Sequence, residues 1–135
     1  PPNADGGLKP AAPLDTDYSG VDVLYICDAR FSDRTSDPAV VANLRKAKFL
    51  IVHSWDANHP LADVADVLIP GAIHPEKEGT YTNVQGRVQR FHQAFQPKGQ
   101  AEGDFEALRR VAARLFPGEA VFQAQGLPEL AEVTA

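Results

Sequence analysis

The stretch Ala65-Asp66-Val67-Leu68-Ile69-Pro70, followed by Glu76-Lys77-Glu78-Gly79-Thr80-Tyr81-Thr82-Asn83 and Gly86-Arg87-Val88-Gln89-Arg90, decides the fold of this chain. It begins as a short apolar strand and continues into an irregular segment rich in Gly, Thr, Asn and Arg. Open α/β sheets place their ligands where buried strands lead into polar, glycine-containing loops. The stretch therefore predicts an α/β fold and, in the same place, a candidate site.

Two further apolar runs precede this strand. Residues 21–27 and 49–53 are rich in β-branched and aromatic residues with little alternation, which is typical of strands covered on both faces. Between them, Asp37 is suited to cap a helix and Pro38 to occupy its first position. Strand, helix and strand at this spacing form a βαβ unit with a right-handed crossover. We expect a small three-layer, Rossmann-like α/β domain with a short parallel sheet.

The remaining segments complete the predicted organisation. Residues 71–102 contain several glycines and prolines and are expected to wrap the surface as an ordered loop, whereas 104–116 carry an apolar stripe at helical spacing. One more helical turn is expected over 128–133. The predicted domains are a linker over 1–20, an α/β domain over 21–118 and a C-terminal tail over 119–135.

Composition excludes several classes of protein. A net charge of −5 over 135 residues supplies no basic face for nucleic acid, and no apolar run approaches the roughly 20 residues that span a bilayer. Cys27 is the one cysteine, so no internal disulfide, zinc site or iron–sulfur cluster can be built from the cysteines of this chain. We interpret it as a small hydrophobic residue at a strand end. The absence of methionine and the linker-like start favour a piece of a larger protein.

The histidines and acidic pairs give little support for self-contained catalysis. His53 is interpreted as a hydrogen-bonded core residue, and His59 and His74, each before a proline, as loop residues. For Glu76, two interpretations stand: a surface charge in a turn, or a carboxylate turned inward to hold the loop through backbone N–H groups.

The loop itself looks like a backbone cradle. Glycine permits close approach or positive φ, Thr and Asn side chains cap exposed amides, and arginine can bind a carboxylate, a phosphate or carbonyls. The residues in question are Gly79, Thr80, Asn83, Gly86 and Arg87. Such a loop by itself is more often a well-braced turn than a nucleotide site, and the chain has no Gly-x-Gly-x-x-Gly or Walker signature.

The order Ala65-Asp66-Val67-Leu68-Ile69-Pro70, then Glu76-x-x-Gly79-Thr80-x-x-Asn83-x-x-Gly86-Arg87-Val88-Gln89, resembles the molybdopterin oxidoreductase superfamily. Within it, the pattern is most similar to the large iron–sulfur subunit of bacterial NADH-quinone oxidoreductase, respiratory complex I. The resemblance is strong over 48–116 and weaker over 21–47. Molybdenum members of the superfamily usually carry Gln-Asp at the end of the strand before this motif, with the aspartate binding guanine. Here Ser54 and Trp55 stand in those places and Asp56 lies one place on.

The resemblance implies a parent protein that passes electrons from NADH through iron–sulfur clusters to quinone. This chain would be a structural module of that parent with no cofactor of its own, in which Arg87, Asn83 and Thr80 lock the loop. Its partners would be other domains of the parent chain and neighbouring complex I subunits, without nucleic acid or membrane insertion. The expected location is the cytoplasmic peripheral arm of a membrane-associated complex.

Two alternatives remain open at this point. In the first, the chain is part of a formate dehydrogenase or nitrate reductase, and Gly79, Thr80, Asn83, Gly86 and Arg87 would contact molybdopterin guanine dinucleotide. In the second, it is a stand-alone module that binds a nucleotide or a protein.

Overall fold

The computed structural model describes residues 14, 16–27 and 33–123. These residues form two compact units, which we describe separately. The first comprises the described residues up to Ala72 together with 98–101, and the second comprises 73–97 and the residues from Glu102 onward. The domain boundaries expected from the sequence stay a prediction.

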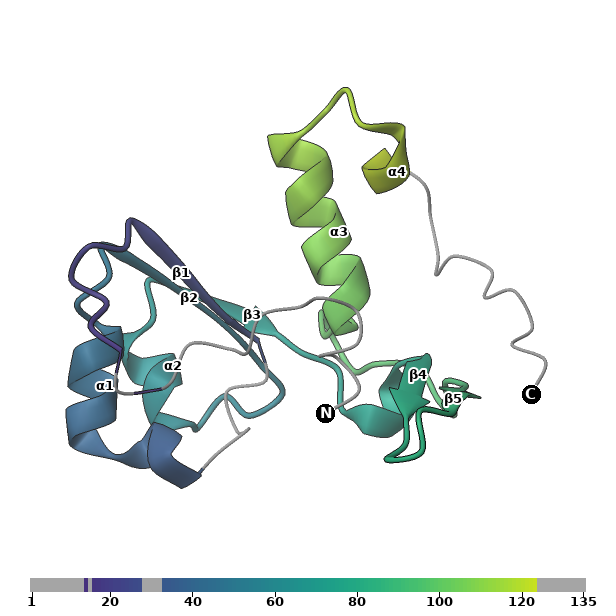
Figure 1. Ribbon diagram of the computed structural model, residues 1–135, viewed down its shortest axis with the longest axis horizontal. Helices are drawn as coiled ribbons and strands as arrows, with labels where there is room; N and C mark the ends of the chain where they lie inside the picture. Colours follow the sequence, from purple (N-terminus) through teal and green to yellow (C-terminus); the bar gives the residue numbers. More distant parts are fainter. Residues whose placement is uncertain (1–13, 15, 28–32, 124–135) are drawn as a thin grey trace. The chain divides into compact units, whose positions relative to one another are not determined.

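The first unit is built on a three-stranded parallel sheet in the order β1-β2-β3 (Figure 1). Its strands are β1 (Val23–Cys27), β2 (Phe49–Ser54) and β3 (Val67–Pro70). A short 3-10 turn η2 (Asp33–Ser36) and helix α1 (Pro38–Leu44) lie between β1 and β2, and helix α2 (Pro60–Val64) lies between β2 and β3. The predicted α/β fold with a short parallel sheet is confirmed.

Both helices of this unit pack on one face of the sheet. The side chains of the core are Tyr18 from the segment before β1, Ile26, Leu50 and Val52 from the strands, Val40 and Leu44 from α1, and Leu61 from α2. The opposite face carries the alternate residues, among them Val23, which is 58% exposed, and Phe49, which is 40% exposed. The sequence predicts three layers. The described residues of this unit form two of them, the sheet and one layer of helices.

The two helices begin at side-chain caps. As predicted, Asp37 caps α1: its Oδ1 accepts a hydrogen bond from the N–H of Ala39 at 2.8 Å, and Pro38 takes the first helical position. His59 caps α2 by accepting from the N–H of Leu61 at 3.2 Å. Its Nε2 lies 3.0 Å from the Thr35 hydroxyl, and the side chain is buried. The expectation of a plain loop histidine was wrong, because His59 joins η2 to α2 inside the unit.

The second unit contains a hairpin and a longer helix. Its elements are η3 (His74–Glu76), β4 (Gly79–Thr82), β5 (Val88–Phe91), α3 (Asp104–Leu115) and α4 (Ala120–Gln123). Helix α3 confirms the element predicted over 104–116. The hairpin corrects the expectation that 71–102 is irregular: its two strands are short, so their alternation is masked by the surrounding glycines and prolines. The turn predicted over 128–133 lies outside the described residues.

Among the described residues, none of the helices has the length and apolar character needed to cross a membrane.

Candidate functional site

The candidate site is the β4–β5 hairpin, where the family-like motif lies. The strands pair antiparallel from Gly79↔Phe91 to Thr82↔Val88. Asn83 closes the turn: its Oδ1 accepts hydrogen bonds from the N–H of Gln85 at 2.9 Å and of Arg87 at 3.0 Å. Gly86 has φ 82°, a conformation in which an L side chain is strained. The local sequence therefore specifies the turn through one side chain and one glycine.

The predicted site residues do not share one face of the hairpin. Side chains alternate along each strand, so Gly79 and Tyr81 lie on the face opposite to Thr80. The Asn83 N–H donates to the Arg87 carbonyl at 3.0 Å, which continues the pairing and puts Arg87 on the face of Tyr81. Thr80 and Arg87 thus point to opposite sides and cannot contact the same small group.

Gly79, like Asn83 and Gly86, has a local structural reason. A Cβ added at Gly79 would lie 3.0 Å from ring atoms of Phe91, so glycine makes room for the cross-strand aromatic. Phe91 stacks on Tyr81 with ring centroids 5.0 Å apart, and the Tyr81 hydroxyl lies 3.1 Å from Nδ1 of His74. The contacts of Gly79 and Asn83 are therefore already explained by the hairpin itself.

Arg87 differs from its neighbours, because its guanidinium forms no hydrogen bond or ion pair with any residue that the structure describes. The expectation that Arg87 locks the loop is not supported: the lock is Asn83, and only the backbone of Arg87 takes part. Arg90, on the other face, lies 3.4 Å from an oxygen of Glu78. Arg87 is thus the charged member of the predicted set, and its exposed side chain remains available to a ligand.

Glu76 holds the segment that leads into the hairpin. Its side chain is 6% exposed, and Oε2 accepts a hydrogen bond from the N–H of Ile73 at 3.1 Å. The carbonyl of Glu76 accepts from the side-chain amide of Gln93 at 3.0 Å, so the same residue ties η3 to the segment after β5. Of the two interpretations of Glu76, the inward-turned carboxylate is confirmed. The exposed Glu78 takes the surface role.

A salt bridge joins the hairpin segment to α3. Nζ of Lys77 lies 2.5 Å from Oδ2 of Asp104, the first residue of the helix. A carboxylate in the first turn is stabilised by the partial positive charge of the helix N-terminus, and the lysine adds a second favourable partner. Lys77 therefore fixes the start of α3 against the hairpin.

Asp66, the acidic residue of the first motif, has a structural role that the sequence did not reveal. Its Oδ2 accepts a hydrogen bond from the N–H of Leu50 at 2.8 Å, and its two oxygens form a bidentate ion pair with Arg45 at 2.8 and 2.9 Å. The Leu50 N–H, and then Arg45, hold the pKa of Asp66 below its ordinary value of 3.8. Asp66 therefore joins the start of β3 to β2 and to the end of α1.

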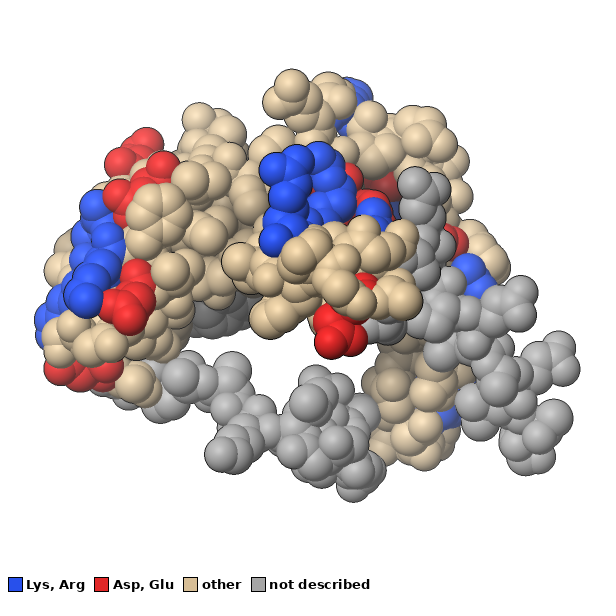
Figure 2. Space-filling model, turned by 90° about the horizontal axis from the view of Figure 1, so that it is seen from above, with Lys and Arg blue, Asp and Glu red and all other residues tan. Residues whose placement is uncertain are grey.

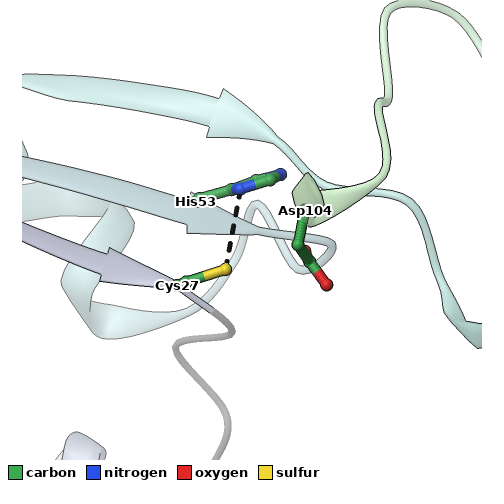
Figure 3. Close-up of side chains that lie close together, drawn as sticks. All are labelled: Cys27, His53 and Asp104. Atoms are coloured by element: carbon green, nitrogen blue, oxygen red, sulfur yellow. Dashed lines mark hydrogen bonds between the residues drawn. The ribbon is translucent and has the colours of Figure 1, made fainter. Parts of the chain in front are cut away.

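His53 and Cys27 lie at the carboxyl ends of neighbouring strands, as Figure 3 shows. Nδ1 of His53 lies 3.1 Å from the Tyr25 hydroxyl and 3.8 Å from Sγ of Cys27. A Cβ at Gly71 would meet the His53 ring at 3.1 Å, which explains the glycine directly after β3. The side chain of His53 is 1% exposed, so its interpretation as a hydrogen-bonded core histidine is confirmed.

Comparison with known proteins gives this architecture a family. Residues 7–114 match the profile of the molybdopterin oxidoreductase family. The chain is 32% identical over 120 residues, 87% of its length, to the F420-dependent formate dehydrogenase subunit alpha of Methanocaldococcus jannaschii. It is 43% identical over 82 residues, 60% of its length, to the nitrate reductase of Symbiobacterium thermophilum. It is also 42% identical over 57 residues, 42% of its length, to the probable oxidoreductase YjgC of Bacillus subtilis.

The chain belongs to the molybdopterin oxidoreductase family. It spans 17%, 10% and 6% of the lengths of these three relatives, respectively. The family predicted from the motif is confirmed. The assignment of Gly79, Thr80, Asn83, Gly86 and Arg87 as cofactor contacts stays a prediction.

Proposed function

We propose that the chain is a module of a molybdopterin-dependent oxidoreductase of the formate dehydrogenase or nitrate reductase type. The observation that carries this proposal is the 32% identity to a formate dehydrogenase alpha subunit over 87% of the chain. None of the three relatives above is named as a component of NADH-quinone oxidoreductase. The relatives therefore favour this function over a complex I module with NADH and quinone chemistry.

Molybdopterin guanine dinucleotide is the cofactor that this function implies. The donor set of the hairpin fits it first through Arg87, whose guanidinium is exposed and suited to a phosphate oxygen. Asn83 retains its side-chain NH2 for a ligand, since only its Oδ1 is used by the turn. Thr80 faces the other side, so it does not belong to the same contact. When bound, the cofactor supplies the redox chemistry, and these residues would orient its phosphates.

Asp56 supports the same proposal from the first unit. It lies two residues beyond the end of β2, at the carboxyl edge of the parallel sheet, where α/β folds bind ligands. Ser54 Oγ accepts from the Asp56 N–H at 3.1 Å, and the carboxylate of Asp56 accepts from the Asn58 N–H at 3.0 Å. The sequence has Trp55 where the resemblance implies a guanine-binding aspartate in molybdenum members, and Asp56 is the next residue.

The test is metal analysis of the native full-length polypeptide that contains this chain. We expect stoichiometric molybdenum together with iron, and reduction of an artificial electron acceptor by formate or oxidation of a reduced dye by nitrate. Iron without molybdenum would overturn the proposal in favour of a complex I-like module. A native polypeptide of only this length, without either metal, would overturn it in favour of a stand-alone binding module.

A variant of Arg87 tests the proposed contact. In the full-length protein, Arg87→Ala should lower molybdenum occupancy without lowering the melting temperature, because its side chain contacts nothing that the hairpin needs. Arg90→Ala is the matched control: it removes the same residue type from the opposite face of the same hairpin. Equal molybdenum content in both variants and the wild type would exclude Arg87 as a cofactor contact.

A further inference from the structure

A hollow lined by arginine lies between α3 and α4 in the second unit. It has a volume of about 340 Å³, and its lining residues are Arg109, Arg110, Ala113, Arg114 and Gln123. Three guanidiniums thus meet in one place although the whole chain has a net charge of −5. In Figure 2, seen from above, Lys and Arg side chains form separate patches with acidic side chains beside them. A concentration of one charge in a concave surface attracts anions.

Arg109 forms the wall of the hollow. Its Nε donates to Oε2 of Glu106 at 2.8 Å, its Nη2 donates to the other oxygen of that carboxylate, and its Nη1 donates to the carbonyl of Phe122 at 2.7 Å. The hydrogen bond and charge of Glu106 raise the pKa of Arg109. All three nitrogens of this guanidinium are engaged, so Arg109 positions α4 against α3 and does not serve as a ligand donor.

Arg110 and Arg114 are the donors that remain. Only Nη1 of Arg110 is engaged, at 3.0 Å from both oxygens of Glu102, which leaves its Nε and Nη2 without a partner among the described residues. Arg114 forms no hydrogen bond or ion pair with any residue that the structure describes. The two arginines stand one helical turn apart, a spacing at which like charges repel and destabilise the helix. An anion between them would relieve that repulsion.

We propose that this hollow binds a small phosphate monoester, held by Arg110 and Arg114. Two planar guanidiniums match the geometry of phosphate oxygens. The charges of the three arginines and of Glu102 and Glu106 sum to one net positive charge. Gln123 adds a side-chain amide from α4; its Nε2 lies 3.4 Å from the Ala113 carbonyl, a weak bond that a ligand oxygen can replace. A volume of about 340 Å³ lies at the small end of ligand sites, which suits a phosphate with a small organic group.

The test uses the 135-residue chain and inorganic phosphate as the probe, with phenyl phosphate as the ester. Titration is followed by the side-chain Nε–H resonances of the arginines in a ¹H–¹⁵N spectrum at constant ionic strength. We expect saturable shifts at Arg110 and Arg114, tighter binding of phenyl phosphate than of phosphate, and no saturable shift at Arg90. Arg114→Gln should weaken binding about tenfold or more, since it removes a charged hydrogen-bonding partner.

Two results would overturn this proposal. One is a titration that reaches about 10 mM phosphate without saturation at either arginine. The other is a shift of similar size at Arg90 and Arg114, which would mean general screening by the added salt. Circular dichroism of the Arg114→Gln variant checks that α3 is intact, and Arg90→Gln, in the hairpin of the same unit, should bind phosphate like the wild type. This result is independent of the molybdenum content of the full-length protein.

Discussion

Replacement of Glu76 by alanine tests the internal brace of the second unit. The carboxylate is 6% exposed and accepts the hydrogen bond of the Ile73 N–H at 3.1 Å. Its removal leaves the part-buried Ile73 N–H without this charged partner, and a hydrogen bond to a charged group contributes about 1.5–3 kcal/mol. We therefore expect Glu76→Ala to lower the free energy of unfolding of this unit by an amount in that range.

The assay combines urea denaturation, followed by far-ultraviolet circular dichroism, with hydrogen exchange of individual amides. Exchange at Ile73 reports the predicted hydrogen bond directly, whereas the urea midpoint reports the unit. In Glu76→Ala the Ile73 amide should exchange at nearly the rate of an open chain. Glu76→Gln keeps an acceptor oxygen at the same place, so it should retain much of the protection.

Glu78→Ala is the matched control, since it removes the same side chain two residues further along. Glu78 is an exposed residue whose salt bridge to Arg90 is 3.4 Å long, and such pairs contribute roughly 0–1 kcal/mol. The reasoning is refuted if both alanine variants change the urea midpoint equally, or if Ile73 stays protected in Glu76→Ala.

Further predictions concern the core, the motif aspartate and the hairpin turn. Leu61→Ala, at a side chain that is 0% exposed, should destabilise the first unit by about 2–5 kcal/mol in urea titrations, whereas Leu115→Ala, at a side chain that is 67% exposed, should change stability by less than about 0.5 kcal/mol. Because folding lowers the pKa of Asp66, its contribution is present above its ordinary pKa of 3.8 and is lost as the pH falls through the lower folded value. Asp66→Asn should therefore flatten the acid limb of a melting-temperature profile, and an unchanged limb would contradict the assigned contacts. Asn83→Ala should accelerate hydrogen exchange of the turn amides, and Gly86→Ala, at φ 82°, should cost about 1 kcal/mol in the same measurement of stability. Wild-type exchange rates in Asn83→Ala would rule out the side chain as the clamp of the turn.

Local elements were well predicted because their determinants lie within a few residues. The Asp37-Pro38 pair starts α1 in the structure as the capping rule predicts, and the apolar stripe over 104–116 becomes α3. The hairpin was not predicted, because its local sequence signals are weak. Its strands have four residues each, and a turn stabilised by Asn83 does not have one of the common two-residue hairpin signatures.

The sequence predicted which residues belong to the candidate site, and the structure corrected how their side chains are arranged. The order of the motif identified Gly79, Thr80, Asn83, Gly86 and Arg87. Spacing alone does not say which of these side chains already form hydrogen bonds within the turn. The antiparallel register decides that Thr80 and Arg87 face opposite ways, because side chains alternate along a strand. The hydrogen bonds of the turn distinguish Asn83, whose Oδ1 closes it, from Arg87, whose guanidinium is available.

The sequence by itself determined the α/β class, the strand order along the chain and the family, because caps, periodicity and motif spacing are properties of neighbouring residues. Only the tertiary structure decided what the polar residues do. Asp66 accepts hydrogen bonds from Leu50 and Arg45, which are 16 and 21 residues away in the sequence. Glu76 accepts one from Gln93, which is 17 residues away. These partners are brought together by the pairing of β2 with β3 and by the return of the chain after β5. A contact between distant residues depends on how whole elements pack, and no local pattern records that packing.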